Sequence, residues 1–427
     1  MRKMLTIVFL ALSLCACSKK DNLMPSASDM AAVRAKLVFT CTHEADHLPS
    51  IDPASDQLFK YGRYLEKEYG PKEFNKIARY YRIAAAYGHY KANNNLQNLL
   101  TSGQASSPDA PSEAIDLALQ LIKAGVPGGY YDMGHYLEEG YGVEQDSDKA
   151  RRYFRKAADL GSPDAQYYVA DLLSARDKAP EISRQMSQCA ANQGLGKAAN
   201  YLGIDFATDQ LFPDAVKAFQ MGVAAGDAQS ALALQEGFNG PSDSDRLNYL
   251  ALPHDPERSR RYKLIGDFID ANDGLNPKLP DIDQIVPLPP AKLPKWDGTF
   301  QWQKEQDAAR PPQKPDEKLV ERLAREKNLD PATGIRLNTE HEKQQDSRVP
   351  LGTVVHPGEV CPQDGVWCVR RFASVSYDAT RRFRKGETMP QLALNDPRPI
   401  PGLDWLLGMR VHRTNEEWTL QSYIDRL

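Results

Sequence analysis

The part of the chain richest in possible metal ligands is Cys41-Thr42-His43-Glu44-Ala45-Asp46-His47. A cysteine and two histidines at this spacing are side chains that zinc accepts as ligands. A structural zinc site needs a fourth ligand, and the sequence has no second cysteine and histidine cluster to supply one. We therefore expect this stretch to cap or pack against the fold, and we predict no metal site and no cofactor.

Motifs for catalysis are also missing. His89 and His135 stand beside Tyr90 and Tyr136 in predicted helices, where a histidine is more often packed than used as a base. The sequence contains no Gly-x-Ser-x-Gly elbow, no Ser-x-x-Lys pair, no phosphate loop and no His-Glu-x-x-His helix. We predict no catalytic residue and expect that the protein is not an enzyme.

The N-terminus has the pattern of an export signal. Arg2 and Lys3 precede an apolar run from Leu5 to Leu14, which is too short to cross a bilayer comfortably. The run ends in Leu14-Cys15-Ala16-Cys17. This ending resembles the lipobox of bacterial lipoproteins, in which cleavage before a cysteine leaves that cysteine lipidated.

The lipobox resemblance implies a lipid anchor. It makes residues 1–16 the signal peptide, Cys17 the acylated residue and residues 17–50 a tether with an N-terminal cap. Ser18 stands where an inner-membrane retention signal would have aspartate, so the resemblance implies the outer membrane, with the protein facing the periplasm. The formal net charge of −4 argues against nucleic acid as a partner.

Four further cysteines can form disulfides in an oxidising periplasm. Cys361 and Cys368 enclose six residues that include Pro362 and Gly365, and this spacing suits a disulfide across a hairpin. Cys41 and Cys189 would be the remaining pair, although sequence alone leaves open whether they come close enough.

Five glycines recur through the middle of the chain. They are separated by 37, 36, 33 and 32 residues, and they are Gly88, Gly125, Gly161, Gly194 and Gly226. Four residues after each glycine the side chain is small, and eight and twelve residues after it the side chain is apolar. Steps of four place these positions on one face of a helix. A period of about 34 residues with a helical stripe predicts a stack of helical hairpins.

One copy of the repeat carries a recognisable motif. It is Gly140-x-Gly142-Val143, then Asp146, then Lys149-Ala150, then Tyr153-Phe154-x-Lys156-Ala157-Ala158-x-x-Gly161. These residues resemble the Sel-one-like (Sel1-like) repeat, a relative of the tetratricopeptide hairpin. The resemblance implies a mostly α fold in which residues 51–255 form a right-handed superhelical solenoid of TPR-like hairpins with a concave binding face.

The pattern changes after the repeats. Within residues 256–345 we predict a capping helix from Glu257 to Asp270, then a strap across 277–302. Six prolines between Pro277 and Pro294 alternate with apolar residues, which a free spacer would not need. We therefore expect the strap to lie along the solenoid. Asn338 to Ser347 is polar and is predicted to be a hinge.

Residues 346–427 have β character and are predicted to form a small β-rich module. Its motif Cys361-Pro362-Gln363-x-Gly365-x-Trp367-Cys368 resembles a module of envelope proteins that accompany type VI secretion effectors. The module also holds a basic cluster that is either a solvated strand face or a contact for an acidic protein surface or lipid headgroups. The cluster comprises Arg370, Arg371, Arg381, Arg382, Arg384 and Lys385.

A helical solenoid presents a surface, so binding is the first functional expectation. Sel-one-like lipoproteins that resemble this chain often neutralise type VI secretion effectors, including phospholipases. The resemblance therefore implies an immunity lipoprotein with a protein partner. Aromatic anchors for that partner are expected among five tyrosines, namely Tyr131, Tyr136, Tyr141, Tyr167 and Tyr168.

Two alternatives remain from the sequence. The first is an envelope scaffold for cell-wall assembly, which differs from immunity only in its partner. The second is an enzyme acting on β-lactams or peptidoglycan, because some cysteine-rich Sel-one-like proteins have been linked to such chemistry. Those proteins pair two cysteines within each repeat, whereas this array contains only Cys189.

Overall fold

The computed structural model describes residues 37–175, 178–337, 349, 352–370, 378–396, 410–415 and 417–423. The predicted signal peptide, Cys17 and the predicted hinge at 338–347 lie outside these residues, as does Arg371 of the basic cluster. Within the described ranges, no helix combines the length and the apolar character needed to cross a membrane.

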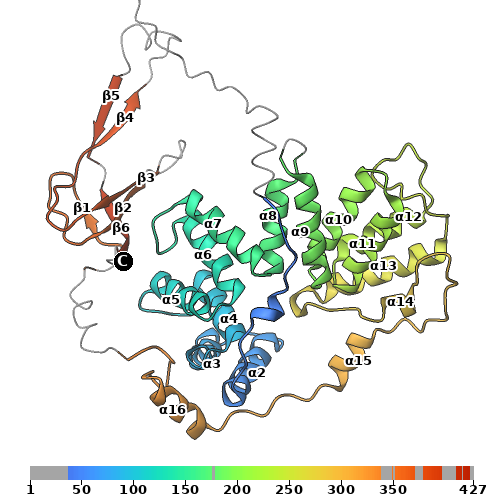
Figure 1. The fold of residues 1–427 in the computed structure, drawn as a ribbon. Helices are drawn as coiled ribbons and strands as arrows, with labels where there is room; N and C mark the ends of the chain where they lie inside the picture. The colour runs from blue at the N-terminus through green and yellow to red at the C-terminus, as the bar shows by residue number, and fades with distance from the viewer. Residues whose placement is uncertain are drawn as a thin grey trace, which may run out of the picture.

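Consecutive helical hairpins form the body of the molecule (Figure 1). The first helices of the hairpins are α2 (Pro53–Lys67), α4 (Tyr90–Thr101), α6 (Pro127–Glu139), α8 (Pro163–Leu173), α10 (Gly196–Thr208) and α12 (Ala228–Phe238). The second helices are α3 (Phe74–Ala86), α5 (Ala110–Lys123), α7 (Ser147–Asp159), α9 (Pro180–Asn192), α11 (Phe212–Ala224) and α13 (Pro256–Ala271). Each first helix packs on its own second helix, and each one after α2 also packs on the hairpin before it, so the predicted stack of hairpins is confirmed.

The helix starts follow from local chemistry. Asp146 caps α7 by accepting a hydrogen bond of 2.8 Å from the backbone N–H of Lys149. Asp52 caps α2 in the same way, and Pro53 occupies the first helical position, where its missing N–H costs nothing. These caps satisfy amide groups that the first turn of a helix leaves without partners.

The five periodic glycines lie in the turns that lead from a second helix into the next first helix. Their φ angles run from +77° at Gly125 to +99° at Gly161, a region that side chains with a Cβ avoid. The glycine therefore reverses the chain within two residues and sets the close spacing of successive hairpins.

The proline-rich strap packs on the last hairpin, as predicted. It follows η2 (Asp273–Leu275) and includes α14 (Ile282–Ile285), and its apolar side chains enter the core formed by α11, α12 and α13. Leu279 and Val286 are fully buried there. The backbone N–H of Leu279 donates to the carbonyl of Ala224 at 2.8 Å, and the Arg261 guanidinium donates to the carbonyl of Ile285 at 2.6 Å.

Beyond the strap, the chain returns to the first hairpin (Figure 1). It passes through α15 (Gln301–Ala308) to α16 (Glu317–Glu326), which packs on α3. Val320, Leu323 and Ala324 of α16 are buried in the core that contains Leu58 and Ile77. We call residues 272–337 the clasp, because this segment contacts both the last and the first hairpin.

Polar contacts hold the clasp to α3. The Arg79 guanidinium pairs with Glu317 and donates to the carbonyl of Pro331 at 2.5 Å. The Tyr87 hydroxyl contacts the carbonyl of Leu323 at 3.1 Å and the carboxylate of Glu326 at 2.6 Å. The first hairpin is therefore joined to the clasp by apolar and by polar contacts.

The C-terminal module contains two antiparallel sheets. The larger has the order β1 (Val354–Val355), β6 (Trp418–Tyr423), β2 (Gly365–Arg370) and β3 (Asp378–Phe383), and the smaller pairs β4 (Leu392–Asp396) with β5 (Arg410–Thr414). Trp367 lies opposite Arg381 in the β2–β3 register. Trp367 and Trp418 are fully buried and form the centre of the module's core.

The predicted Cys361–Cys368 disulfide needs correction, because both residues are buried free thiols in the structure. Trp367 and Val369 share the module's core with Cys361. Cys368 lies between them on β2, so the alternation of a strand directs its side chain to the opposite face of the sheet. The Cys361 thiol instead donates to the carbonyl of Gln363 at 3.1 Å.

The clasp should stabilise the first hairpin. We predict that Leu323→Ala lowers the free energy of unfolding by about 2–4 kcal/mol, because it leaves a cavity in a buried contact. Chemical denaturation measures this loss, and hydrogen exchange should show faster exchange in α2 and α3. Arg325→Ala, on the exposed side of α16, is the matched control, and its free energy of unfolding should stay close to that of the unmodified protein. Equal stability of the two variants would contradict the role given to the clasp.

Candidate functional site: the first-helix face

Residues six and seven positions after the periodic glycines lie on one continuous surface. We call this surface the first-helix face, and its members are Asn94, Asn95, Tyr131, Asp132, Tyr167, Tyr168, Asn200, Tyr201, Leu232 and Ala233. Neighbouring first helices touch through it: the rings of Tyr131 and Tyr168 are 6.3 Å apart, and those of Tyr167 and Tyr201 are 6.0 Å apart. The face therefore runs across several repeats without interruption.

Three of the five predicted tyrosines lie on this face. Tyr131, Tyr167 and Tyr168 are half-buried. The Tyr168 hydroxyl donates to the carboxylate of Glu138 at 2.8 Å, and burial together with this hydrogen bond raises the pKa of Tyr168 to about 12. Side chains held in this way present apolar ring surface at little entropic cost, which suits binding anchors.

Tyr136 and Tyr141 do not lie on the face. Tyr136 is 7% exposed and donates to the side-chain carbonyl of Gln97 at 2.8 Å, so it is a core residue and not a partner contact. It stands one position before Leu137, which is the apolar residue twelve positions after Gly125. Tyr141 follows α6 and packs on the ring of Tyr136 at 5.5 Å.

Sequence reasoning missed Tyr201 and Asp132. Both lie seven residues after a periodic glycine, as Tyr168 does. The repeat itself contained the signal. The positions four and eight residues after each glycine are small or apolar and face the core, so the positions six and seven residues after it must lie on the opposite, accessible side of the helix.

Asp132 is half-buried in the face. Its carboxylate accepts a hydrogen bond of 3.1 Å from the Gln97 amide. Burial, with further effects of the Asp164 and Glu44 carboxylates, raises the pKa of Asp132 to about 7. The Lys197 ammonium pairs with the Asp164 carboxylate at 2.9 Å.

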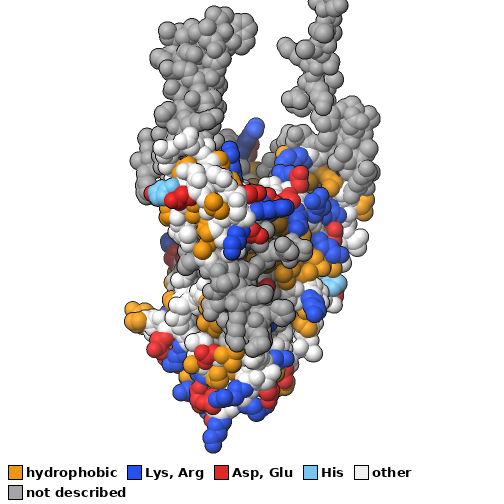
Figure 2. Space-filling view, turned by 90° about the vertical axis from the view of Figure 1, so that its left-hand side faces the viewer, with side chains coloured by type: hydrophobic (Ala, Val, Ile, Leu, Met, Phe, Trp, Pro, Cys, Tyr) orange, Lys and Arg blue, Asp and Glu red, His pale blue; other side chains and the backbone are white. Residues whose placement is uncertain are grey.

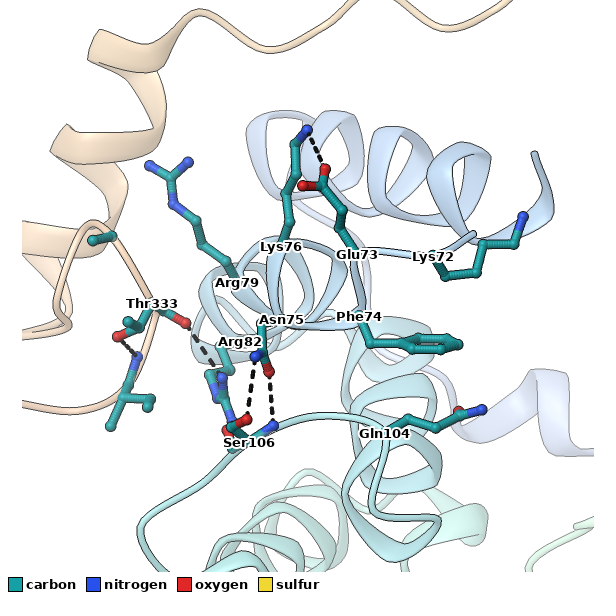
Figure 3. A pocket seen from close by; sticks show the side chains of 12 residues that line it. Lys72, Glu73, Phe74, Asn75, Lys76, Arg79, Arg82, Gln104, Ser106 and Thr333 are labelled. Atoms are coloured by element: carbon teal, nitrogen blue, oxygen red, sulfur yellow. Dashed lines mark hydrogen bonds and ion pairs between the residues drawn. The ribbon is translucent and has the colours of Figure 1, made fainter. Parts of the chain in front are cut away.

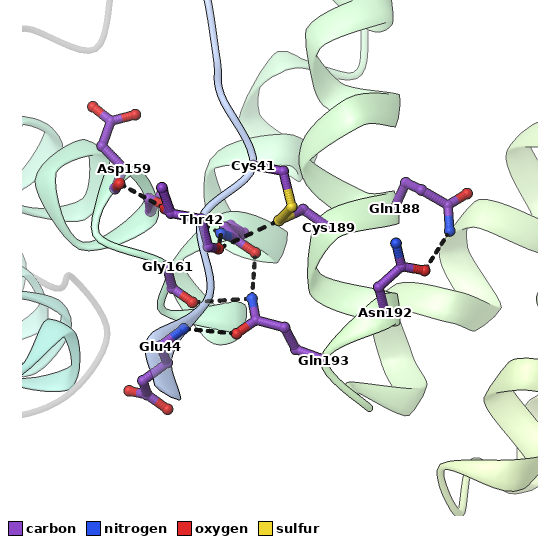
Figure 4. The surroundings of a disulfide bond; sticks show 11 residues. Cys41, Thr42, Glu44, Asp159, Gly161, Gln188, Cys189, Asn192 and Gln193 are labelled. Atoms are coloured by element: carbon purple, nitrogen blue, oxygen red, sulfur yellow. Dashed lines mark hydrogen bonds between the residues drawn. A yellow bond between two sulfur atoms is a disulfide. The ribbon is translucent and has the colours of Figure 1, made fainter. Parts of the chain in front are cut away.

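The N-terminal segment, residues 37–52, packs beside Gly161, Cys189 and Gln193 (Figure 4), and we call it the border of the face. Cys41 is joined to Cys189 of α9 by a disulfide across 148 residues of sequence. The side-chain amide of Gln166 donates to the carbonyl of Thr42 at 3.0 Å, and the N–H of Glu44 donates to Gln193 at 2.8 Å. Glu44 is thereby brought near α6 and α8, and burial, with a further effect of Asp164, raises its pKa.

The predicted packing role of this segment agrees with the structure. The possible ligand atoms of Cys41, His43 and Cys189 lie within 4.8 Å of one another, yet both sulfurs are used by the disulfide. His43 alone does not make a metal site.

The two histidines considered for catalysis are packed. His89 is buried and caps α4 by accepting from the N–H of Ala92 at 3.2 Å, and burial lowers its pKa. His135 packs against the rings of Tyr131 and Phe154, at 4.6 and 4.8 Å.

A cavity of 780 Å³ lies at the seam between α3 and the clasp (Figure 3). Most of its cations are already paired: Lys76 with Glu73 at 2.9 Å, Arg82 with Glu113 at 2.7 Å, and Arg79 as described above. These pairs hold the seam together, so the cavity is part of the clasp contact.

The described members of the basic cluster are exposed. Arg381, Arg382, Arg384 and Lys385 lie at the end of β3 and in the following turn. Arg382 pairs with Glu144 of the α6–α7 turn at 2.5 Å. Figure 2 shows Lys and Arg side chains interspersed with Asp and Glu on the side of the molecule that it presents, which is typical of a solvated surface.

Comparison with known proteins agrees with the repeat. The Sel1 repeat profile matches residues 127–162, which contain α6 and α7, and the profile of a domain of unknown function, DUF6396, matches residues 230–337. No curated protein matches the chain significantly. The chain therefore contains a Sel1 repeat, and its fold is a solenoid of Sel1-like hairpins.

Solved structures of two Pseudomonas aeruginosa immunity proteins are similar to this chain. PA5088 is 26% identical with a TM-score of 0.50, over 59% of this chain and 94% of PA5088. PA5087 is 28% identical with a TM-score of 0.48, over 59% of this chain and 95% of PA5087. A Sel1 repeat protein from Oxalobacter formigenes is 17% identical with a TM-score of 0.40, over 50% of this chain and 87% of that protein.

The disulfide should fix the N-terminal segment. We predict that Cys41→Ser lowers the free energy of unfolding by roughly 3–5 kcal/mol, because a long loop in the unfolded chain is no longer closed. Denaturant titration with and without dithiothreitol measures this. The reductant should destabilise the unmodified protein and leave Cys41→Ser unchanged, whereas Cys361→Ser should respond to the reductant as the unmodified protein does. An effect of reductant on Cys41→Ser would contradict this assignment.

Asp132 should make stability depend on pH. Its pKa is raised on folding, so the folded state holds more protons than the unfolded state between about pH 4 and 7, and stability falls as the pH rises through that range. Asp132→Asn keeps an acceptor for Gln97 and removes the charge. We expect it to stabilise the protein by about 1–3 kcal/mol at pH 7.5 and by much less at pH 4.5. Denaturant titrations at both pH values test this, with Asp148→Asn on α7 as the control.

Proposed function

We propose that the chain is an immunity lipoprotein of the bacterial envelope. Cys17 carries the lipid anchor, the protein faces the periplasm from the outer membrane, and the solenoid binds a secreted effector through the first-helix face. The effector is of the type VI secretion class and acts on phospholipid. Binding at the membrane would block such an enzyme where its substrate lies.

The observation that carries this proposal is the similarity to the immunity protein PA5088, which extends over 94% of that protein. The half-buried tyrosines of the first-helix face support it, because ordered aromatic side chains are typical anchors for protein partners. The N-terminal lipobox pattern supports the anchor.

The β-lactam or peptidoglycan enzyme is the weaker alternative. Its analogy depends on cysteines paired within each repeat, whereas Cys189 pairs with Cys41 of the N-terminal segment. The envelope scaffold uses the same surface for another partner, and nothing in the described residues favours it over immunity.

A deletion strain tests the proposal. Cells without this gene should be killed in competition with sibling cells that deliver effectors, and a plasmid copy should restore survival. The complementing protein should fractionate with the outer membrane, and Cys17→Ser should not. Survival of the deletion strain at the level of its parent would overturn immunity, and capture of cell-wall synthases alone by the anchored protein would favour the scaffold.

Tyrosine variants test the surface. We predict that Tyr201→Ala weakens effector binding about tenfold or more, since loss of an aromatic anchor commonly costs about 2 kcal/mol. The complementation assay should show reduced survival at equal protein abundance by immunoblot. Tyr153→Ala on α7, a half-buried tyrosine away from the face that packs on Tyr130, is the control and should protect fully. Equal protection by the two variants would place binding elsewhere.

A further inference from the structure

The first-helix face and its border carry an excess of negative charge among the described residues. Asp132 belongs to the face and Glu44 to its border. The carboxylates of Asp164, Asp171 and Glu236 and the ammonium groups of Lys91 and Lys197 stand three or four residues from a face member on the same helices, and the Glu138 carboxylate accepts from Tyr168 of the face. Two of the carboxylates are already engaged: Asp164 pairs with Lys197, and Glu138 accepts from Tyr168 and lies 3.6 Å from His135. The face is therefore complementary to a positively charged surface.

Asp132 is the carboxylate with the least compensation. No lysine or arginine of the described residues pairs with it, and its hydrogen bond comes from the neutral Gln97 amide. The charged groups around it are Asp164 of α8, itself paired with Lys197 of α10, and Glu44 of the N-terminal segment, which Lys91 of α4 offsets. A desolvated carboxylate without a cation is costly in the free protein, and a cation supplied by a partner would relieve that cost.

Aromatic side chains share the face with this carboxylate, and exposed apolar side chains follow along the solenoid. Tyr131 and Tyr168 stand on the same face, and tyrosine rings attract cations placed over them. Farther along the solenoid, Ile204 and Leu232 are 54% and 47% exposed on α10 and α12. Successive packed helices are separated by roughly 10 Å, so α6 and α12 are too far apart for one small molecule to contact both. The occupant that fits is a protein segment.

Building on the proposed function, we propose that the partner docks a segment that carries an arginine or lysine side chain onto the first-helix face. The cation lies against the Asp132 carboxylate and the rings of Tyr131 and Tyr168. Apolar residues of the same segment cover Ile204 and Leu232. Specificity then comes from the cation, and contact area comes from the rings and the apolar residues.

A phage-displayed library of disulfide-constrained random dodecapeptides tests this chemistry on the purified full chain. Selection at pH 7.5 should enrich peptides with arginine or lysine next to apolar residues. Asp132→Asn should bind the selected peptides at least tenfold more weakly, whereas Asp148→Asn on α7 should bind them as the unmodified protein does. Enriched peptides without a cationic residue, or equal binding by Asp132→Asn, would overturn the proposal.

Proton release gives a second readout. A cation beside Asp132 favours its ionised form, so binding of a selected peptide at pH 7 should release a fraction of a proton, seen by calorimetry in two buffers of different ionisation enthalpy. Asp132→Asn should release less, and equal release would contradict the assignment. The peptide experiments do not depend on immunity. Their failure would contradict only the proposal of a cationic segment, whereas survival of the deletion strain would contradict only the proposal of immunity.

Discussion

A stack of hairpins has two ends, and the burial of both ends is the constraint on which the rest of this structure depends. Each hairpin buries its apolar side against a neighbour, so the first and the last lack one partner. One segment of the chain, the clasp, covers both: Leu279 and Val286 at the last hairpin, Val320 and Leu323 at the first. The start of the clasp, which follows the last hairpin, also contacts the first hairpin, since the Lys67 ammonium lies 3.5 Å from the carbonyl of Leu275. The first and the last hairpin are therefore linked by contacts outside the repeats.

The glycine turns allow these extra segments to approach closely. A Cβ at Gly161 would come within 2.5 Å of the backbone of His43, and one at Gly226 would come within 2.0 Å of the carbonyl oxygen of Pro277. The N-terminal segment and the clasp thus use the same edge of the solenoid, where the turns offer bare backbone. A repeat glycine serves both the reversal of the chain and the attachment of a covering segment.

The first-helix face differs from the core in how its polar groups are satisfied. Tyr136 and Gln97 satisfy each other inside the stack. Asp132, one turn away on the same helix, accepts from the neutral Gln97 amide, and burial raises the pKa of its carboxyl. A protein that accepts such a desolvation cost at an accessible surface commonly does so for recognition.

The sequence by itself determined the hairpins, their period and the strap, because these follow from local periodicity, glycine turns and interleaved apolar residues. Three of the tyrosines that it predicted as partner contacts, Tyr131, Tyr167 and Tyr168, lie on the first-helix face. Only the tertiary structure decided which cysteines pair, because Cys41 and Cys189 meet through packing across 148 residues, while Cys361 and Cys368 are kept apart by strand alternation. Only the tertiary structure, too, placed Tyr136 in the core of the stack and brought Glu44 beside α6 and α8. Such contacts depend on how distant segments fold back on the solenoid, and local sequence patterns do not predict this folding back.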